Sequence, residues 1–244
     1  MRRLFVETLT EEGSLISLDR VSVHHARVLR LTVGSDVTLF DGRGSSALAR
    51  IEELDGEALL CRILSVDERM PSTTTSITLV QSMPKGEKLE AIVRATTEIG
   101  VDEIRLAISE RTIARPDAAR SATKLERLSR VAREAARQSE RSTVPTLFEP
   151  MQLNEVLAGA PAGALHLVFA PGAARGIDAI RDRIDDAKAV WVWVGPEGGF
   201  SPAEVEMLER EACIPVRIFD SVLRVETAAP VAVALVRSAV VRSR

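Results

Sequence analysis

One stretch of the chain decides its fold class: Trp191-Val192-Trp193-Val194-Gly195-Pro196-Glu197-Gly198-Gly199-Phe200-Ser201-Pro202-Ala203-Glu204. The apolar run 189–194 has the length of a buried strand, and it stops at a glycine and a proline that favour a turn. Ser201 and Glu204 then stand at the N-cap and N3 positions of a helix, where a capping box would stabilise the helix by roughly 1 kcal/mol. Glycines let a bound molecule approach the backbone, and a helix start offers free N–H groups, so this segment predicts a site for a nucleotide-like ligand.

The glycine loop matches neither of the commoner nucleotide-binding loops. GxGxxG is absent, and no Gly-Lys-Ser or Gly-Lys-Thr follows to hold phosphates as a Walker loop would. A second unusual loop further along leads directly into an apolar helix: Phe219-Asp220-Ser221-Val222-Leu223-Arg224-Val225-Glu226-Thr227-Ala228. The pair of loops is the signal of a ligand site.

The composition is that of a globular protein outside the membrane. With 244 residues the chain can bury roughly 70 to 75% of its unfolded surface, which allows one large domain or two modest ones. No apolar run reaches transmembrane length, because Pro230 and Arg237 interrupt the longest candidate, residues 228–241. The N-terminus becomes acidic too early for a secretory signal, so we expect a cytoplasmic protein with no membrane partner.

Cysteine and histidine usage argues against a metal centre. Cys61 and Cys213 lie in apolar contexts without a CxxC pattern, so we expect buried free thiols. Three histidines in the whole chain make a zinc site improbable, and no metal is predicted.

The charge of the chain does not decide whether the protein binds nucleic acid. The net charge of −3 argues against general attraction to RNA, yet residues 111–141 hold nine basic side chains against four acidic ones. Arginine outnumbers lysine 28 to 4 across the chain, so the excess can also reflect coding bias. Charge alone leaves both interpretations standing.

The first 70 residues predict a small β-barrel. Short alternating segments at 4–8, 14–18, 36–40, 47–53 and 58–66 read as strands, with Asp-Gly turns between some of them. One short helix is expected over 24–31, presenting Arg27 and Arg30 near each other. The polar, proline-marked stretch 70–76 is the expected linker.

The remainder alternates strands with helices. Strands are expected at 77–83, 103–108, 165–170, 189–194 and 216–219, and helices at 87–99, 122–139, 177–186, 202–212 and from 227. Such alternation predicts an α/β domain with a mainly parallel sheet covered by helices on both faces. Ligands bind beyond the carboxyl ends of such strands, where loops 171–172, 195–200 and 220–226 fall.

Short motifs spread over the chain carry a resemblance to a known family: Arg3-Leu4-Phe5, His24 with Arg27-Val28-Leu29-Arg30, Phe40-Asp41-Gly42, Lys85-Gly86-Glu87-Lys88, Thr97-Glu98-Ile99-Gly100-Val101, Ser109-Glu110-Arg111, Gln138 with Arg141, Val144-Pro145, Gly195-Pro196-Glu197-Gly198-Gly199, and Leu223-Arg224 with Glu226-Thr227-Ala228. With these motifs the chain resembles the RsmE family of SPOUT methyltransferases. The resemblance implies a PUA-like RNA-binding β-barrel at residues 1–72. It also implies a SPOUT α/β domain at 73–244 with a C-terminal trefoil knot.

The same resemblance implies the activity. Family members transfer a methyl group from S-adenosylmethionine to uridine N3 of 16S ribosomal RNA, so the implied partners are that RNA within a small ribosomal subunit and a second copy of the chain in a homodimer. The second loop departs from the family pattern, with Phe219-Asp220 where Leu-Gly is common and Val225 where Thr is common. Asp220 would then need a left-handed backbone or a shifted loop.

Candidate site residues follow from the loops and the resemblance together. The expected cofactor-binding residues are Ala170, Pro171, Gly172, Gly195, Pro196, Gly198, Gly199, Ile218, Phe219, Asp220, Val222, Leu223, Thr227 and Ala228. The catalytic candidates are Arg224, Glu226 and Glu197. The RNA-binding candidates are Arg3, Arg27, Arg30, Arg111, Arg137 and Arg141, acting mostly through phosphates.

Each catalytic candidate keeps an alternative role. Arg224 can hydrogen-bond a uracil oxygen, hold the RNA backbone, or bridge loop carbonyls. Glu226 can accept the N3 proton, orient Arg224, or favour the helix dipole. Glu197 can balance a sulfonium charge or fix its loop through backbone N–H groups.

Two other function classes stay open. A nucleotide-dependent oxidoreductase would need the Rossmann glycines and an acidic ribose ligand, which the chain lacks. A non-catalytic RNA-binding module could keep the same fold. Specific binding of S-adenosylmethionine and methyl transfer to RNA would separate the three.

Overall fold

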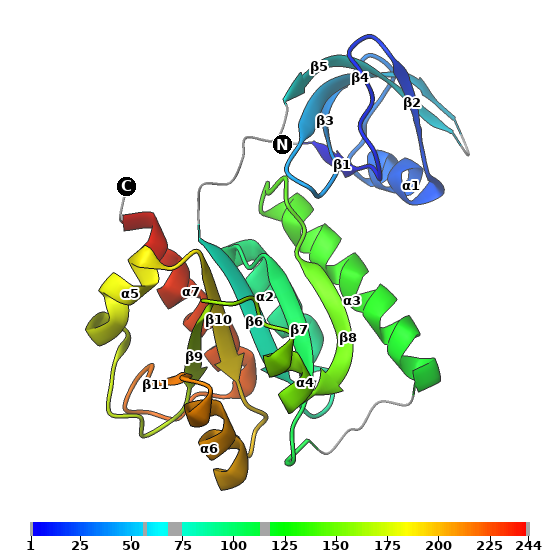
Figure 1. Ribbon diagram of the computed structural model, residues 1–244. Coiled ribbons are helices and arrows are strands. Elements are labelled where there is room, and N and C mark those ends of the chain that lie inside the picture. The colour runs from blue at the N-terminus through cyan, green and yellow to red at the C-terminus, as the bar shows by residue number, and fades with distance from the viewer. Residues whose placement is uncertain (1, 56–57, 68–74, 113–117, 243–244) are drawn as a thin grey trace. The chain divides into compact units, whose positions relative to one another are not determined.

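The computed structural model describes residues 2–55, 58–67, 75–112 and 118–242, which form two compact units (Figure 1). The first unit comprises residues 1–71 together with 133–144, and the second comprises 72–132 and 145–244. The predicted linker falls largely outside the described residues, so the boundary between residues 72 and 73 stays a prediction.

A five-stranded sheet in the order β1-β3-β4-β5-β2 forms the first unit. The strands are β1 (Arg3–Phe5), β2 (Leu15–Leu18), β3 (Asp36–Phe40), β4 (Ser46–Leu54) and β5 (Leu59–Asp67). Alternate residues of β4 and β5 face a core that contains Leu39, Ile51, Leu59 and Ile63, so the predicted small β-fold is confirmed. Only the pairing of β1 with β3 is parallel within this sheet.

Residues 142–144 complete the first unit by pairing with the turn after β3. The Val144 N–H donates to the Gly42 carbonyl at 2.8 Å, and Arg43 forms an antiparallel β-bridge with Thr143. Gly42 has φ 72°, and a Cβ there would lie 3.0 Å from the Val144 side chain, so this close pairing requires glycine. The contact explains why 133–144 belong to the first unit.

The short helix of the first unit begins earlier than the sequence pattern predicted. Helix α1 spans Arg20–Val28 because Asp19 caps its start, accepting from the Ser22 N–H at 2.8 Å. Arg30 follows the helix in a left-handed conformation at φ 53°. The predicted helix over 24–31 therefore ends too late, since Arg30 lies outside α1. That the Arg27 and Arg30 side chains lie near each other stays a prediction.

The second unit is built on a six-stranded sheet in which every pairing is parallel, in the order β11-β9-β10-β6-β7-β8. The strands are β6 (Ser76–Ser82), β7 (Glu103–Ile108), β8 (Thr146–Gln152), β9 (Leu165–Phe169), β10 (Ala189–Val194) and β11 (Ile214–Val216). The helices are α2 (Lys88–Ile99), α3 (Ala118–Gln138, shared with the first unit), α4 (Leu153–Ala158), η1 (Ile177–Ile180), α5 (Arg181–Asp186), α6 (Pro202–Arg210) and α7 (Val225–Arg242). The predicted parallel α/β organisation is confirmed.

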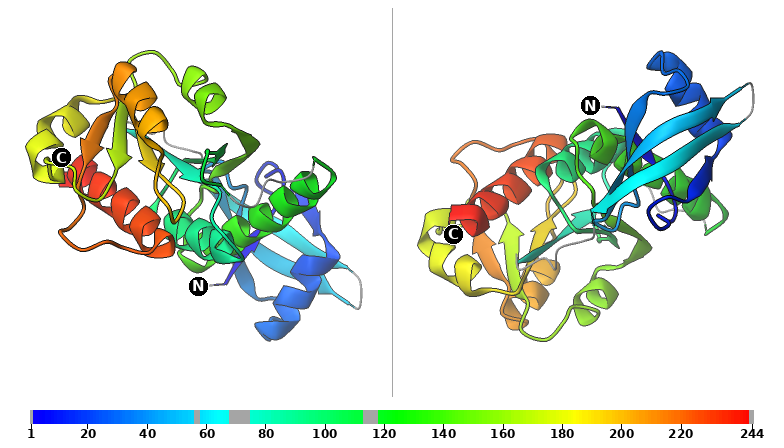
Figure 2. Two further views of the ribbon diagram at one scale, coloured as in Figure 1. Left: turned by 90° about the horizontal axis from the view of Figure 1, so that it is seen from below. Right: turned by 90° about the horizontal axis from the view of Figure 1, so that it is seen from above.

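Helices cover both faces of this sheet (Figure 2). On one face α7 packs against α2, β6 and β10. On the other, Trp191 and Trp193 of β10 pack with residues of α4 and α6, including Val156 and Leu208. The central strand β10 is buried on both faces, as its uninterrupted apolar run predicted.

Near its end the chain passes from the edge strand β11 back to the inner strands of the sheet. Strand β11 ends at Val216 beside β9, whereas α7 starts at Val225 and packs against α2 and the inner strands β6 and β10. Residues 217–224 make this passage, on which the predicted trefoil knot depends. The predicted strand 216–219 is placed too late, because β11 covers only Ile214–Val216.

Both cysteines are buried free thiols, as predicted. Burial raises the pKa of the Cys61 thiol to about 11 and that of Cys213 to about 12. Among the described helices, none is long and apolar enough to cross a membrane.

Candidate functional site

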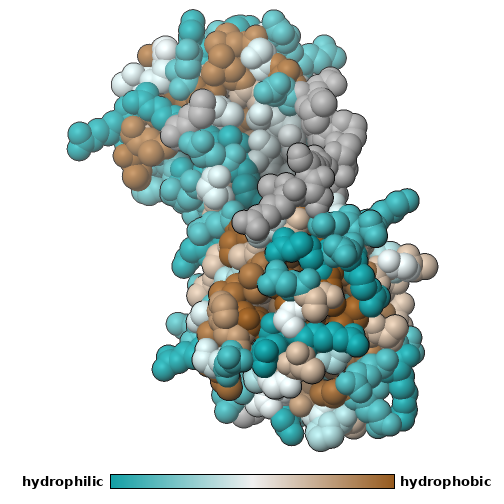
Figure 3. Space-filling view, turned by 90° about the vertical axis from the view of Figure 1, so that its left-hand side faces the viewer, coloured by the Kyte–Doolittle hydropathy of each residue, from teal (hydrophilic) through white to brown (hydrophobic). Residues whose placement is uncertain are grey.

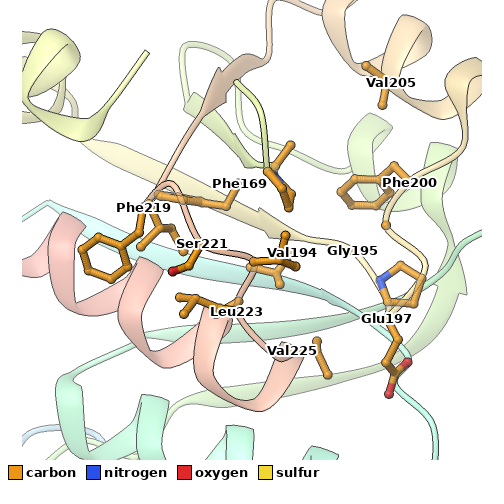
Figure 4. A pocket seen from close by; sticks show the side chains of 17 residues that line it. Phe169, Val194, Gly195, Glu197, Phe200, Val205, Phe219, Ser221, Leu223 and Val225 are labelled. Atoms are coloured by element: carbon orange, nitrogen blue, oxygen red, sulfur yellow. The ribbon is translucent and has the colours of Figure 1, made fainter. Parts of the chain in front are cut away.

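A cavity of about 310 Å³ lies where β9 and β10 end in the second unit (Figure 4). It is lined by Phe169, Ala170, Pro171, Val194, Gly195, Pro196, Glu197, Gly199, Phe200, Val205, Ile218, Phe219, Ser221, Val222, Leu223, Val225 and Ala228. All three loops that the sequence singled out therefore meet at one place. Parallel strands deliver their carboxyl-end loops to the same edge, which is why loops far apart in sequence converge here.

Most of the expected cofactor-binding residues line this cavity. Ten do so: Ala170, Pro171, Gly195, Pro196, Gly199, Ile218, Phe219, Val222, Leu223 and Ala228. Four do not: Gly172, Gly198, Asp220 and Thr227. Their part in ligand binding stays a prediction.

The backbone of Asp220 differs from one of the two expectations, and the other, a shifted loop, stays a prediction. Its backbone is not left-handed, because the described non-glycine residues with positive φ are Arg30, Glu140 and Ala212. Its side chain is 93% exposed and pairs with Arg217 Nη1 at 3.2 Å. Asp220 thus stays outside the cavity without backbone strain.

Several lining residues were missed because they look like ordinary core residues in the sequence. Phe169 and Val194 are the last residues of buried strands, while Phe200, Val205 and Val225 flank or begin helices. The available signal was their place at the carboxyl ends of strands, in the adjoining loops or in the first helical turn that follows. Phe200, Ser221 and Val225 lay inside the two quoted stretches but were not selected.

The glycines of the loop 195–200 serve three different purposes. A Cβ on Gly195 would lie 3.2 Å from the Gly199 and Phe200 backbone, so Gly195 allows the loop to fold against itself. Gly199 has open space but φ 66°, and its N–H donates to the Pro196 carbonyl at 2.8 Å in a tight turn. A Cβ on Gly198 would lie 3.3 Å from Arg111 Cδ. Lack of space therefore requires a glycine at 195, whereas the positive φ favours a glycine at 199.

The predicted capping box at the start of α6 is present. Glu204 N donates to Ser201 Oγ at 3.3 Å, and Ser201 N donates to Glu204 Oε2 at 2.8 Å. Because these two N–H groups are already used, they are not free for a ligand, contrary to the simplest form of the expectation. The same Glu204 accepts from Glu110 N at 2.7 Å, which joins the turn after β7 to the start of α6.

Arg111, expected to bind RNA, lies against the glycine loop. Its Nη1 donates to the Gly198 carbonyl at 2.5 Å. Its turn is fixed by the Ser109 N–H, which donates to Thr112 Oγ1 at 3.0 Å. The exposed guanidinium thus rests on the loop that lines the cavity.

Two of the catalytic candidates meet at one lysine. Lys88 Nζ lies 2.8 Å from Glu197 Oε1 and 3.5 Å from Glu226 Oε2. Burial alone would raise the pKa of Glu197, but hydrogen bonds from Lys88 and from backbone N–H groups, including that of Lys85, hold it below its usual value. The bond to Glu197 in turn raises the pKa of Lys88. Lys88 was not among the predicted site residues, although it stands in one of the quoted motifs.

Arg224 is exposed at the start of α7. Its carbonyl accepts from the Thr227 and Ala228 N–H groups at 2.9 and 2.7 Å, so its backbone opens the helix. The charged neighbour recorded for Glu226 is Lys88, so the geometry does not support the alternative in which Glu226 orients Arg224.

The remaining RNA candidates fall into two groups. Arg27 and Arg30 are exposed on the first unit, and Arg27 Nη2 donates to the Asp55 carbonyl at 2.9 Å. Arg3 is only 6% exposed and donates to the Arg141 carbonyl and to Ser142 Oγ at 3.2 and 3.1 Å.

Arg141 and Arg137 also have intramolecular partners. Arg141 Nη2 donates to Thr143 Oγ1 at 2.7 Å, and Arg137 pairs with Glu134 one helical turn away. Arg3 and Arg141 thus take part in joining 133–144 to the sheet of the first unit.

Comparison with known proteins matches both parts of the chain to one family. A model described as an RNA methyltransferase domain matches residues 71–237, and one described as an RNA methyltransferase PUA domain matches residues 18–64. The chain is 34% identical over 237 residues to a Mycobacterium bovis protein named ribosomal RNA small subunit methyltransferase E, covering 95% of this chain and 89% of that one. This chain belongs to the RsmE family of RNA methyltransferases.

Further relatives support the RsmE assignment. The Bacillus subtilis protein of the same name is 25% identical, with 93% of each chain covered. The Neisseria gonorrhoeae ribosomal RNA small subunit methyltransferase E, solved bound to S-adenosyl methionine, superposes with a TM-score of 0.88 at 30% identity, covering 96% of this chain and 95% of that one. The predicted fold class, a PUA-like unit followed by a SPOUT-type α/β unit, is confirmed.

Proposed function

We propose that this chain methylates uridine N3 in the 16S RNA of the small ribosomal subunit, with S-adenosylmethionine as methyl donor. The observation that carries the proposal is the convergence of the three predicted loops on one cavity. Family membership and the S-adenosylmethionine-bound relative support the same conclusion. The domain roles proposed are RNA binding for residues 1–72 and methyl transfer for 73–244.

The cavity residues fit this donor. Apolar walls from Phe169, Val194 and Leu223 suit an adenine ring. Glu197 and Phe219 lie at opposite sides of the lining group in Figure 4, so the cavity joins an apolar end to a carboxylate end. When bound, S-adenosylmethionine supplies a methyl group on a cationic sulfur, and a carboxylate is a suitable neighbour for that charge.

Arg224 is proposed to stabilise the substrate during the reaction. Uracil N3 must lose its proton as the new N–C bond forms, and the adjacent carbonyl oxygens gain negative charge. An exposed guanidinium at the start of α7 can donate to such an oxygen, a contact that strengthens as the charge develops. Glu226 remains a candidate acceptor for the N3 proton, while its place beside Lys88 favours a positioning role.

Exposed arginines are proposed to position the RNA. Arg27 and Arg30 on the first unit and Arg111 beside the glycine loop can contact phosphates. We assign Arg3 and Arg141 a structural role in the first unit in preference to RNA contact, because both donate hydrogen bonds within that unit. Arg137, paired with Glu134, stays a weaker candidate for RNA contact.

A homodimer acting in the cytoplasm is part of the proposal. Apolar side chains reach the surface of the second unit between polar ones in Figure 3. Helix α7 keeps Ala228, Val231 and Leu235 only half-buried within one chain. Such surface favours association with a second copy, which light scattering would detect as about twice the 26.5 kDa chain mass.

Methyl transfer to ribosomal particles tests the proposed function. Small-subunit particles from a strain lacking the enzyme are incubated with methyl-labelled S-adenosylmethionine, and the modified nucleosides are identified by mass spectrometry. We expect label in N3-methyluridine of 16S RNA. Binding of the donor without transfer to particles or RNA would favour a non-catalytic module, and binding of a nicotinamide dinucleotide instead would favour an oxidoreductase.

A further inference from the structure

Three charged side chains from three separate elements meet beside the cavity. Lys88 lies in the first turn of α2, Glu197 in the loop after β10, and Glu226 in the first turn of α7. Lys88 Nζ is 2.8 Å from Glu197 Oε1 and 3.5 Å from Glu226 Oε2. The lysine therefore joins the loop that lines the cavity to the helix that follows the second loop.

The carboxylates differ in how fully they are satisfied. Glu197 accepts hydrogen bonds from Lys88 Nζ and from the Lys85 N–H, the latter at 3.2 and 3.3 Å to its two oxygens. Glu226 Oε2 is buried and accepts no hydrogen bond from the described residues. A buried carboxylate oxygen without a donor is costly, and the cation beside it is what offsets that cost.

This arrangement places more negative than positive charge in the trio. One ammonium faces two carboxylates, and of the three residues only Glu197 lines the cavity. A cationic ligand in the cavity would gain from Glu197 and lose from Lys88. A neutral ligand of the same shape would be affected little by either residue, because the Coulomb energy requires a charge on the ligand as well.

We propose that Lys88 is a positioning residue that joins Glu197 to Glu226 and, by partly neutralising Glu197, sets how strongly the cavity prefers a cationic sulfonium nucleoside over its neutral thioether product. The inference rests on the proposed function and deepens it. Transfer of the methyl group removes the positive charge from sulfur, so the net negative charge of the trio favours the donor over its neutral product. Lys88 moderates that preference by partly neutralising Glu197.

Equilibrium binding to three nucleosides tests the proposal without any turnover. Dissociation constants are measured by calorimetry for S-adenosylmethionine, for neutral S-adenosylhomocysteine, and for sinefungin, in which an amine replaces the sulfonium. The readout is the ratio of the S-adenosylhomocysteine constant to the S-adenosylmethionine constant. A purely structural role changes both constants together and leaves the ratio unmoved, whereas a charge role changes the ratio.

The variants give opposite predicted signs. Lys88→Met should raise the ratio on the order of 10-fold, since Glu197 is no longer neutralised, and Glu197→Gln should lower it by a similar factor. Glu226→Gln should lower it less, because Glu226 does not line the cavity. Sinefungin should follow S-adenosylmethionine in every variant, since it shares the charge but not the methyl group.

Two control variants separate charge from folding. Lys88→Arg keeps the cation and should keep the ratio within about twofold. Lys85→Met removes an equal charge three residues away, but Lys85 serves Glu197 through its backbone N–H, so the ratio should also hold. Far-ultraviolet circular dichroism confirms that each protein is folded.

The outcomes are distinguishable. A ratio that stays constant in folded Lys88→Met and Glu197→Gln overturns the inference while leaving the proposed function intact. If the unaltered protein binds none of the three nucleosides, the proposed function fails and the inference falls with it.

Discussion

The two loops that line most of the cavity are held in different ways. Residues 195–200 are fixed by the Gly199 to Pro196 turn, by Arg111 on Gly198 and by Lys88 on Glu197. Between β11 and α7, where the second loop lies, Arg217 and Arg224 make backbone hydrogen bonds. Among the described residues, none makes a backbone–backbone hydrogen bond with residues 218–223. Phe219 and Val222 of that segment are 53% and 76% exposed.

This difference separates a preformed loop from one that its ligand must order. A segment with exposed apolar side chains and no backbone bonds has little to hold it in the free protein. We infer that the first loop supplies a fixed floor, and that the second closes on the bound nucleoside. Substitutions in the first loop should therefore cost more than substitutions in the second, apart from residues that touch the substrate.

Gly195→Val should have the largest effect on affinity. A Cβ alone would lie 3.2 Å from the backbone of Gly199 and Phe200, and the branched side chain adds to that clash. We expect affinity for S-adenosylmethionine to fall more than about 100-fold, equal to about 2.8 kcal/mol. Calorimetric titration measures it, and unchanged affinity in a folded variant would remove the first loop from the ligand site.

Arg224→Ala should affect the reaction and not donor binding. Loss of one hydrogen-bond donor that stabilises developing charge costs about 100-fold in rate. Because Arg224 does not line the cavity, its loss should leave the affinity for S-adenosylmethionine unchanged. Single-turnover methyl transfer onto small-subunit particles, at saturating RNA and donor, gives the rate. A variant that transfers methyl at the parent rate would leave Arg224 as a structural residue at the start of α7.

Gly199→Ala should have an intermediate effect with a different cause from Gly195→Val. Space around Gly199 is open, but φ 66° disfavours any side chain by roughly 1 to 2 kcal/mol, so affinity should fall about 10-fold. Gly163, at φ 80° with open space as well, lies outside the lining and provides a matched control. Equal losses of affinity from Gly163→Ala and Gly199→Ala would contradict a specific role for the first loop.

Asp220→Gly should have the smallest effect. It restores the glycine common in the family, but Asp220 has no left-handed backbone to relieve, and an exposed pair such as that with Arg217 contributes about 0 to 1 kcal/mol. We expect donor affinity within about twofold of the parent. A tenfold gain in the same titration would mean that Asp220 strains the second loop.

Local signals were enough to predict the elements that carry them. Strand β10, the capping box of α6 and the Gly100 C-cap of α2 at φ 113° all follow from neighbouring residues. The start of α1 was missed although Asp19 is a good N-cap, because the apolar pattern was read from His24 onward.

Edge elements were harder to predict because their stability comes from distant partners. Strand β8 was missed since it is half-exposed, contains Pro150 and pairs with β7 through an irregular register between Arg105 and Ala107. Strand β11 is a three-residue edge strand whose position depends on β9. Lys88 was missed for a related reason, because its two carboxylate partners are brought to it only by the fold.

Hydrogen exchange with and without S-adenosylmethionine tests the central claim most directly, namely that one cavity with a fixed first loop and a closing second loop binds the donor. We predict that saturating donor slows exchange most at residues 218–223, which lack backbone partners in the free chain, and changes residues 196–200 less. Slowed exchange confined to other parts of the chain, with both loops unaffected, would contradict the account.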